Sequence, residues 1–417
     1  MSDLRAAFYG DDFTGSVDAL LQFARRGWSG RLFVGLPDEA TLREAAAAVD
    51  VIGVAGIARS LPTALLDAEL RPVLTRLAAL RPRLVQYKAC STADSSAEIG
   101  SLGRVIELGR ELVAERTVPV LFAQPDFGRY TAFGTHFAAE GGTVHRLDRQ
   151  PTMSTHPTTP MTEADLARHL GRQTALPIGS LPFTAYTSTD AVASAIAESA
   201  DAAVVLDALD DDHLTLVGGA VAALPRPVFA IGSGGLSHGV AAAAPGTGPR
   251  AVPTRTGTTG PVLAVSGSRS TQTRRQADAA AAAGWLVRPL ETQDGADMSD
   301  VLEALAAGRS VVLTSDDARL PVEGVPLEAL ATAAAAVVGQ ALRAGATRRI
   351  IVCGGDTSSR VTGMLGIDSL EIAANPWANV VLLRAHASDA AIDGAELLLK
   401  GGQVGDADLF DRIRALD

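Results

Sequence analysis

The chain has 417 residues, more than one hydrophobic core usually organises, so two domains are expected. A hydrophobic fraction of 47% with a charged fraction of 20% is typical of globular proteins and excludes a disordered chain. The net charge of −11 argues against a nucleic-acid partner, because phosphate backbones require basic surfaces, but it leaves room for an anionic small molecule held by local arginines and backbone amides.

Cysteine use and the first residues point to a cytoplasmic protein. Cys90 and Cys353 are far apart and each ends an apolar run, which predicts free, buried thiols in a reducing compartment. Residues 1–5 lack the basic and apolar regions of a signal peptide. The apolar stretch 329–338 is too short to span a membrane and predicts a buried helix.

Short apolar runs alternate with helical patterns along the first half, which predicts βαβ units and a parallel sheet. One helix is expected to follow residues 10–15 and to run through Ala24. Two others are expected at 63–80 and 163–173, the last capped by Thr162. The expected strands cover 6–9, 31–34, 51–55, 84–88, 119–122, 203–206 and 228–231.

The stretch 246–260 is rich in proline and glycine, which predicts a linker between two domains, 1–245 and 261–417. A new alternation of strands and helices follows the linker. The fold class expected is therefore α/β, with two mostly parallel sheets flanked by helices and a ligand cleft between them. The strands expected in the second half cover 262–265, 286–288, 311–313, 350–352, 380–382 and 397–399.

Paired acids follow the first strand. Asp11 and Asp12 precede a helix, so the simplest interpretation is a capping turn. Both carboxylates cannot cap the same donors, however, so one of them is expected to line a ligand crevice at the carboxyl end of the strand, with Thr14 beside it. Arg59 follows the third strand; it is either a solvated surface residue or a bidentate ligand for a carboxylate.

The fourth strand ends in Lys88 and a run of small polar residues. Lys88 can neutralise an anion, while Ser91, Asp94 and Ser95 can bind hydroxyl groups. The alternative is a Ser/Thr-rich loop that caps a helix starting near residue 97. Arg104 would then lie one or two turns into that helix and within reach of the same site.

Three turns in the second half have the character of anion sites, although each is also compatible with an ordinary strand–helix turn. One contains Ser266 and Ser268, and another contains Gly402. In the third, two glycines precede Asp356, Thr357 and Ser358, which are expected to cap a helix beginning near residue 360. Neither G-x-x-x-x-G-K-[ST] nor a strand followed by G-x-G-x-x-G occurs, so neither standard nucleotide fingerprint applies.

In this order, these stretches resemble the four-carbon acid sugar kinase family. The matching stretches are 10–15 (GDDFTG), 88–96 (KACSTADSS), 232–236 (GSGGL), 266–270 (SGSRS), 354–357 (GGDT) and 400–405 (KGGQVG). The resemblance implies an acid-sugar domain followed by a nucleotide domain. It also implies phosphorylation by ATP of the terminal hydroxyl of a tetronate or 3-oxo-tetronate.

The resemblance also implies site residues. Asp12, Arg59, Lys88, Asp94 and Ser95 would bind the acid sugar. The residues that would bind ATP are Ser266, Ser268, Gly354, Gly355, Asp356, Thr357 and Gly402. Many members have Lys-Lys-x-Asp-Ser-Thr-x-Arg-Gly at 88–96 and Gly-Asn-Phe-Gly at 402–405, and this chain departs from both patterns. The first departure affects the substrate loop. The identity of the acid is therefore left open, and a branched or 3-oxo acid such as 3-oxo-isoapionate is one of the candidate substrates.

Phosphoryl transfer requires positioning and charge neutralisation. Arg59 and Lys88 would anchor the sugar carboxylate, Asp356 would bind Mg²⁺ or nucleotide, and the domains would close around the linker. Asp11 or Asp12 would be the catalytic base, with Asp94 and Asp356 as alternatives.

Two other functions stay open. A dehydrogenase is disfavoured by the missing dinucleotide fingerprint. A non-catalytic sugar-acid or nucleotide-binding protein would not need three glycine turns. The partners expected are an acid sugar and ATP, without nucleic acid or membrane, and a homo-oligomer is left open.

Overall fold

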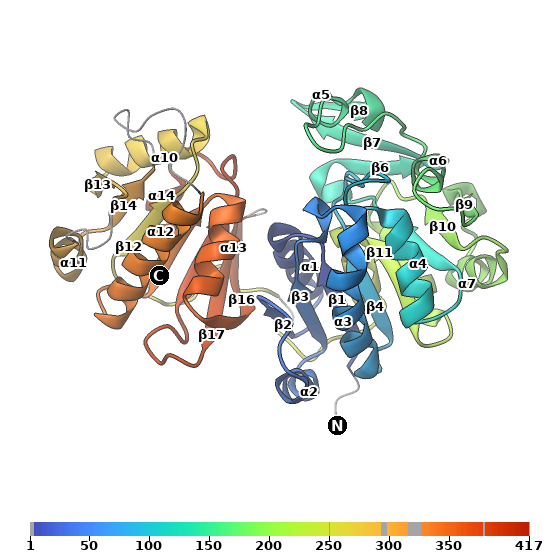
Figure 1. The fold of residues 1–417 in the computed structure, drawn as a ribbon, viewed down its shortest axis with the longest axis horizontal. Coiled ribbons are helices and arrows are strands. Elements are labelled where there is room, and N and C mark those ends of the chain that lie inside the picture. The colour runs from blue at the N-terminus through green and yellow to red at the C-terminus, as the bar shows by residue number, and fades with distance from the viewer. Residues whose placement is uncertain (1–3, 250, 293–297, 316–326, 378–379, 417) are drawn as a thin grey trace. The chain divides into compact units, whose positions relative to one another are not determined.

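The computed structural model describes residues 4–249, 251–292, 298–315, 327–377 and 380–416. The chain divides into two compact units, unit 1 (Met1–Ala251) and unit 2 (Val252–Asp417). Each unit is an α/β layer structure, as expected from the alternation of apolar runs with helical patterns (Figure 1).

Unit 1 has a sheet in which every strand pairing is parallel. Strand β1 lies between β3 and β4. The chain therefore adds β2 and β3 on one side of β1 and then crosses to the other side to add β4, which makes β1 the topological switch point of the sheet. In sheet order the strands are β2 (Gly30–Phe33), β3 (Val51–Ala55), β1 (Ala6–Gly10), β4 (Leu84–Lys88), β11 (Val228–Gly232), β5 (Val118–Leu121), β10 (Ala203–Leu206) and β9 (Ile178–Leu181).

Both faces of this sheet are buried. Phe8 and Tyr9 are adjacent in β1 and therefore point to opposite faces. Phe8 stacks on Phe23 of α1, with ring centroids 6.1 Å apart, and Tyr9 stacks on Tyr87 at 5.7 Å. Burying each such ring contributes about 2–3 kcal/mol, which favours mostly apolar residues in the central strands. Gln86 and Lys88 of β4 are buried exceptions.

The helices of unit 1 form two layers. Helix α9 packs against α1 and α8, and α3 packs against α4. The helices of unit 1 are α1 (Phe13–Arg25), α2 (Glu39–Ala48), α3 (Leu66–Ala79), α4 (Leu102–Leu112), α5 (Pro151–Ser154), α6 (Leu166–Gly171), α7 (Thr189–Glu198), α8 (Asp211–Ala223) and α9 (Gly234–Ala242). A small antiparallel sheet of β6 (Arg129–Ala132), β7 (Thr135–Glu140) and β8 (Thr143–Arg146) accompanies them (Figure 1).

Unit 2 contains a mixed sheet. Five strands are parallel, and β17 runs antiparallel to β18 and β16. In sheet order the strands are β13 (Leu286–Pro289), β14 (Val311–Thr314), β12 (Val262–Ser266), β15 (Arg349–Cys353), β18 (Glu396–Lys400), β17 (Val380–Ala387) and β16 (Ile367–Trp377). The helices described are α10 (Thr271–Ala282), α11 (Ser299–Ala306), α12 (Leu327–Arg343), α13 (Gly355–Met364) and α14 (Leu409–Arg414).

A buried arginine holds together the amino-terminal edge of the sheet of unit 2. Arg349 Nε donates to Glu396 Oε2 at 3.0 Å, and both side chains are almost fully buried. The other donors of Arg349 bind the carbonyl groups of Ile413, Leu416 and Thr258 and the hydroxyl of Thr256. The five N–H groups of the guanidinium are therefore all used, and they connect two strands with the end of α14 and a preceding segment.

Both ends of the segment 246–260 are fixed within the units. Thr247 donates from its backbone N–H and its hydroxyl to Asp50 Oδ2, at 2.7 and 2.6 Å, in unit 1. Thr258 donates to Glu396 Oε1 at 2.6 Å in unit 2, close to the contact between Thr256 and Arg349. The proline- and glycine-rich composition therefore does not leave this stretch without contacts.

Several expected element bounds are wrong. Strands β6–β9 and β16 are missing from the expected set because they are partly exposed, so their sequences are mixed. Helix α6 begins at Leu166 and is capped by Asp165, not Thr162, because the Leu166 N–H donates to the Gly134 carbonyl and keeps the preceding residues extended. Helix α4 begins at Leu102 with Ser101 as its cap, because residues 96–99 close a separate turn.

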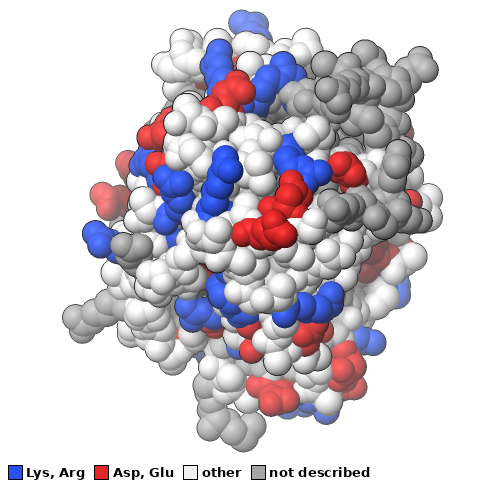
Figure 2. Space-filling view, turned by 90° about the vertical axis from the view of Figure 1, so that its left-hand side faces the viewer, with Lys and Arg blue, Asp and Glu red and all other residues white. Residues whose placement is uncertain are grey.

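Both cysteines are free thiols, and Cys353 is buried whereas Cys90 is partly exposed. Among the described helices, none combines the length and the apolar character needed to cross a bilayer. On the face drawn in Figure 2, the Lys and Arg side chains of the described residues are interspersed with Asp and Glu.

Candidate functional sites

The carboxyl ends of the central strands of unit 1 lie side by side. Gly10 at the end of β1 pairs in register with Ala55 of β3 and with Lys88 of β4, which in turn pairs with Gly232 of β11. The loops that follow these strands therefore meet at one edge of the sheet, next to β1. In α/β sheets, this point of reversal is where ligands bind.

Arg59 joins the two acids of the first loop. It lies in a short 3₁₀ turn, Ala58–Ser60, after β3, and its Nη2 donates to Asp11 Oδ1 at 2.7 Å and to Asp12 Oδ1 at 2.9 Å. Nε binds Asp11 Oδ2 and Nη1 binds Asp12 Oδ2, so both carboxylates are held bidentately. The backbone N–H of Gly15 also donates to Asp12, which is the N-cap of α1.

The environments of the two acids differ. Asp11 is buried, with 2% of its side chain exposed, while 32% of Asp12 is exposed. Burial raises the pKa of Asp11, although the neighbouring Arg59 guanidinium lowers it. The expectation that one acid caps the helix is confirmed for Asp12, and the other acid faces Arg59.

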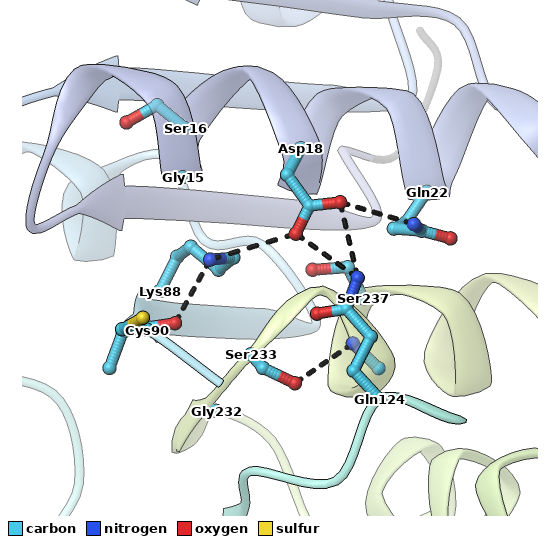
Figure 3. Close-up of polar contacts among 12 residues, drawn as sticks. Gly15, Ser16, Asp18, Gln22, Lys88, Cys90, Gln124, Gly232, Ser233 and Ser237 are labelled. Atoms are coloured by element: carbon cyan, nitrogen blue, oxygen red, sulfur yellow. Dashed lines mark hydrogen bonds and ion pairs between the residues drawn. The ribbon is translucent and has the colours of Figure 1, made fainter. Parts of the chain in front are cut away.

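Lys88 is close to this ion-pair cluster, because a Cβ at Gly15 would lie 2.4 Å from Asp12 Oδ1 and 3.0 Å from Lys88 Nζ. It is also close to a second polar group, in which Asp18 lies beside Lys88 and contacts Gln22 and Gln124 (Figure 3). The Lys88 side chain is 3% exposed, and its ammonium donates to the Ala89 carbonyl at 2.9 Å and lies 3.8 Å from Asp18 Oδ2. Gln124 Nε2, which follows β5, donates to both oxygens of Asp18 at 3.3 Å, and Gln22 Nε2 donates to Oδ1 at 3.1 Å. Positive charge, carboxylates and amides thus converge at the ends of β1, β4 and β5.

Asp18, Gln22 and Gln124 are absent from the set of residues expected from the sequence. A signal for two of them exists: Asp18 and Gln22 are four residues apart on α1, whose neighbouring positions are apolar and buried. A polar pair on the covered side of such a helix indicates a polar site beneath it. Gln124 begins a weaker polar run after the end of β5, but its proximity to Asp18 depends on the order of the strands, which the sequence does not give.

The loop after β4 is fixed by buried histidines. His136 Nε2 is 2.8 Å from the Ser91 carbonyl and Nδ1 is 2.9 Å from the hydroxyl of Thr131. Burial lowers the pKa of His136 to about 4, so the ring is neutral at pH 7. Its Nε2–H therefore donates to Ser91, which binds the loop to the small sheet through its backbone.

The other polar residues of this loop also have partners within unit 1. Ser95 is buried; its Oγ lies 2.9 Å from His169 Nε2 and accepts from Gln173 Nε2 at 2.9 Å. Burial lowers the pKa of His169 to about 4. The Thr92 hydroxyl donates to Asp94, whose side chain is partly exposed.

Two other expected substrate ligands have different surroundings. Arg104 is in the first turn of α4, and its guanidinium binds both oxygens of Asp67, at 2.8 and 2.7 Å, and Glu107. It is therefore joined to α3 and not to the Arg59 or Lys88 clusters. Thr14 is exposed at the start of α1.

In unit 2, the three expected turns meet at the carboxyl edge of the sheet. Strands β12, β15 and β18 are neighbours, and their last residues, Ser266, Cys353 and Lys400, are in register. The Gly267 N–H donates to the Cys353 carbonyl at 3.1 Å, and the Gly354 N–H donates to the Lys400 carbonyl at 2.9 Å.

The turns of unit 2 pack so closely that side chains would collide. A Cβ at Gly402 would lie 2.4 Å from Ser268 Oγ, and one at Gly267 would lie 2.2 Å from Thr357 Oγ1. Gly354 has φ +111°, a conformation that favours glycine. The result is a compact floor of backbone, hydroxyl groups and the start of a helix, which suits an anion.

The helix after Gly354 starts earlier than expected. Helix α13 begins at Gly355, with Gly354 as an N-cap that has no side-chain bond. Asp356, Thr357 and Ser358 therefore lie in its first turn and do not cap it; the turn at Gly354 redirects the chain before they are reached. Gly355 and Asp356 are exposed, and Thr357 is buried.

Asp356 has the chemistry of a Mg²⁺ ligand, but it would be the single protein carboxylate in this turn. In the described part of the chain, no three His, Cys, Asp or Glu residues are grouped as a metal site. Mg²⁺ commonly binds through one or two carboxylates, with water and phosphate oxygens as its other ligands. The exposed Asp356 at a helix start fits that kind of site.

A cavity of about 820 Å³ lies at the opposite edge of the sheet of unit 1. It is lined by residues that precede strands, including Leu4, Arg5 and Arg83. In α/β folds, ligands bind at the carboxyl edge, and that edge carries the Arg59 and Lys88 clusters.

Comparison with known families matches both units. Residues 6–240 match the family described as a sugar-binding N-terminal domain, and residues 263–410 match the family described as a nucleotide-binding C-terminal domain.

Curated relatives match nearly the full length. The chain is 37% identical to the 3-oxo-isoapionate kinase of Paraburkholderia graminis, over 99% of this chain and 94% of the relative. It is 33% identical to the 3-oxo-tetronate kinase of Methylobacterium radiotolerans, over 98% and 97%. The D-threonate kinase of Bordetella bronchiseptica is 28% identical, over 96% and 95%.

Two solved structures share the fold. A Salmonella typhimurium LT2 protein has a TM-score of 0.80 with 24% identity, covering 100% of both chains. A Haemophilus influenzae protein has a TM-score of 0.75 with 23% identity, covering 97% of this chain and 98% of the other.

Proposed function

The chain belongs to the four-carbon acid sugar kinase family, and we propose that it transfers the γ-phosphoryl group of ATP to the terminal hydroxyl of a four-carbon or branched 3-oxo acid sugar. The acid sugar is assigned to unit 1 and the nucleotide to unit 2. The observation that carries the proposal is the grouping of Arg59, Lys88 and three carboxylates at the carboxyl edge beside β1.

This grouping suits an acid sugar, which presents one carboxylate and several hydroxyl groups. Lys88 and Arg59 supply positive charge for the carboxylate. Of the five N–H groups of Arg59, four are used on Asp11 and Asp12, so one is left for a ligand, while Lys88 donates one bond to a carbonyl. Asp11, Asp12 and Asp18 offer acceptors for hydroxyl groups.

The turns of unit 2 are assigned to the phosphates of ATP. Backbone N–H groups and the hydroxyls of Ser266, Ser268 and Thr357 would bind the phosphate oxygens, and Asp356 would hold Mg²⁺. The metal ion would neutralise charge on the phosphates. Gly402 would allow the turn after β18 to approach Ser268 closely.

Among the candidate acid substrates, the 3-oxo acids are the ones that we propose first as phosphoryl acceptors. The relatives that are 31–37% identical over almost the full length include 3-oxo-isoapionate and 3-oxo-tetronate kinases. The loop 88–96, which departs from the common family pattern, lies in the unit that would bind the acid. Its Cys90 and Thr92 side chains are 3.0 Å apart, where they shape the loop beside Lys88.

We expect ADP release from ATP and Mg²⁺ in the presence of 3-oxo-isoapionate or 3-oxo-tetronate, with weaker turnover of threonate and erythronate. The measurement is a coupled ADP assay over this panel, with ³¹P NMR to locate the phosphate ester on the terminal carbon. Thermal shifts with acid and nucleotide but no ADP release would indicate a non-catalytic binding protein. Turnover of none of the acids would contradict the proposal.

A second prediction concerns the nucleotide turn. Gly402→Ala should weaken ATP binding, because its Cβ would lie 2.4 Å from Ser268 Oγ and 3.1 Å from Ser270 Cβ. The turn is expected to relieve this overpacking by leaving its binding geometry, and restoring that geometry would cost about 1–3 kcal/mol, a loss of affinity of about 5- to 150-fold. Titration with a non-hydrolysable ATP analogue measures it.

Gly401→Ala is the matched control for this variant. A Cβ at Gly401 would meet Val404 Cγ2 at 3.6 Å, an ordinary contact, so its nucleotide affinity should be close to that of the wild type. Equal affinities for the two variants would show that the turn after β18 does not contact the nucleotide.

A further inference from the structure

Asp18 differs from the other acids of the candidate sugar site because its carboxylate is not neutralised by an arginine. Its oxygens accept from the amides of Gln22 and Gln124, and Lys88 Nζ is 3.8 Å from Oδ2, beyond hydrogen-bonding distance (Figure 3). Its side chain is 14% exposed, so it is shielded but accessible.

Asp11 and Asp12 are poorly suited to accept a proton. Each has both oxygens bound to the Arg59 guanidinium, and Asp12 also accepts from the Gly15 N–H. A proton on either acid would compete with these charge-assisted bonds. Their arrangement favours a structural and charge-positioning role.

Two glycines bring backbone close to Asp18 and Lys88. Helix α9 starts at Gly234, where a Cβ would lie 2.4 Å from Asp18 Oδ2 and 2.9 Å from Gln124 Nε2. In α1, a Cβ at Gly15 would lie 3.0 Å from Lys88 Nζ. Because these positions carry no side chain, the start of α9, the carboxylate and the ammonium form one continuous polar wall.

We propose that Asp18, and not Asp11 or Asp12, is the catalytic base that accepts the proton of the acceptor hydroxyl; this rests on the proposed kinase function. The hydroxyl O–H bond breaks and its proton moves to Asp18 Oδ2. The oxygen forms a bond to the γ-phosphorus of ATP, the bond from that phosphorus to the bridging oxygen breaks, and ADP leaves. Lys88 stabilises the negative charge that develops beside Asp18.

The electrostatics of the site agree with this role. Burial raises the pKa of Asp18, while the charge of Lys88 works in the opposite direction. The other titratable groups facing it are Asp126, whose charge also raises the pKa, and His238, whose own pKa is lowered by burial. A carboxylate with a raised pKa is a better proton acceptor near neutral pH.

The test compares Asp18→Asn with the wild-type protein and with Asp126→Asn. Asp126 is exposed and binds Arg25 and Gln22, so the control removes a nearby negative charge, one that raises the pKa of Asp18, and leaves the Asp18 carboxylate in place. We expect Asp18→Asn to lower kcat by about 10²- to 10⁴-fold, with ATP-analogue affinity and KM for the acid within about threefold of the wild type, a change of about 0.7 kcal/mol or less. Asp126→Asn should retain activity.

The pH profile separates catalysis from structure. In the wild type, kcat/KM should fall as the pH is lowered, with a midpoint above about 4, the ordinary value for Asp, and Asp18→Asn should lose this limb. Should the Asn variant melt below the assay temperature, Asp18→Ala with added formate replaces it, and restored turnover supports the assignment while absent rescue overturns it.

Each outcome has one meaning. Near-normal turnover of Asp18→Asn, or an unchanged acid limb, overturns the role of Asp18 and leaves the kinase function standing. Absence of wild-type turnover on every acid overturns the kinase function, and the base assignment with it.

Discussion

Arg59→Ala should reduce turnover by at least about a hundredfold and lower the free energy of unfolding of unit 1 by about 3–5 kcal/mol. Removal of the guanidinium leaves the buried Asp11 carboxylate without a cation and frees Asp12, which caps α1. The measurements are the coupled ADP assay and urea unfolding.

Two variants separate the contributions to this effect. Arg59→Met with Asp11→Asn removes the buried charge and should recover part of the stability without recovering activity, because the replacement of both partners avoids an uncompensated charge. Arg71→Ala is the matched control, since Arg71 also binds two carboxylates, Asp67 and Glu111, but is exposed. It should change stability by about 1 kcal/mol or less. Wild-type turnover in Arg59→Ala would rule out the Arg59 cluster as part of the site.

Arg349→Met should destabilise unit 2 by about 3–5 kcal/mol. Glu396 is 1% exposed and would keep its charge without a cationic partner, and three carbonyl groups would each lose a charged donor. A two-step urea unfolding curve, followed by fluorescence of Trp285 and Trp377 in unit 2, measures the loss.

Arg343→Met controls for the removal of an arginine from unit 2. Arg343 binds Asp389 on the surface, with 58% of its side chain exposed, so its loss should cost about 1 kcal/mol or less. Arg349→Met combined with Glu396→Gln should be more stable than the single variant. A single Arg349→Met variant as stable as the wild type would contradict the buried ion pair.

The strands that sequence patterns predicted best are those covered on both faces. Runs such as 51–55 and 350–352 are apolar at every position because no face meets water. β8 is mostly exposed, and β16 contains Asp368, Glu371 and Pro376, so neither shows the apolar run or the strict alternation that identifies a strand. Each is antiparallel to a neighbour in the sequence, β8 to β7 and β16 to β17, so the pairing is local even though the strand pattern is weak.

The same distinction applies to the candidate sites. The loops that contain Asp11, Lys88 and Gly354 could be predicted because polar and glycine residues follow apolar strands, and parallel strands end at a common edge. The side chains that bind these residues could not be predicted from the sequence. The sequence separates Arg59 from Asp11 and Asp12, and Lys88 from Asp18, by tens of residues, and Arg104 is equally far from Asp67, which binds it.

The sequence alone determined the α/β class, most central strands, the three glycine-containing turns of the second half and the family resemblance, because these depend on local composition and on the order of motifs. Only the tertiary structure decided that Arg59 holds both Asp11 and Asp12, and that Asp18 lies close to both Lys88 and Gln124. The physical reason is that a carboxylate becomes an ion-pair partner, a helix cap or a proton acceptor according to the charges and donors around it. The crossing of the chain at β1 brings those neighbours from separate strands.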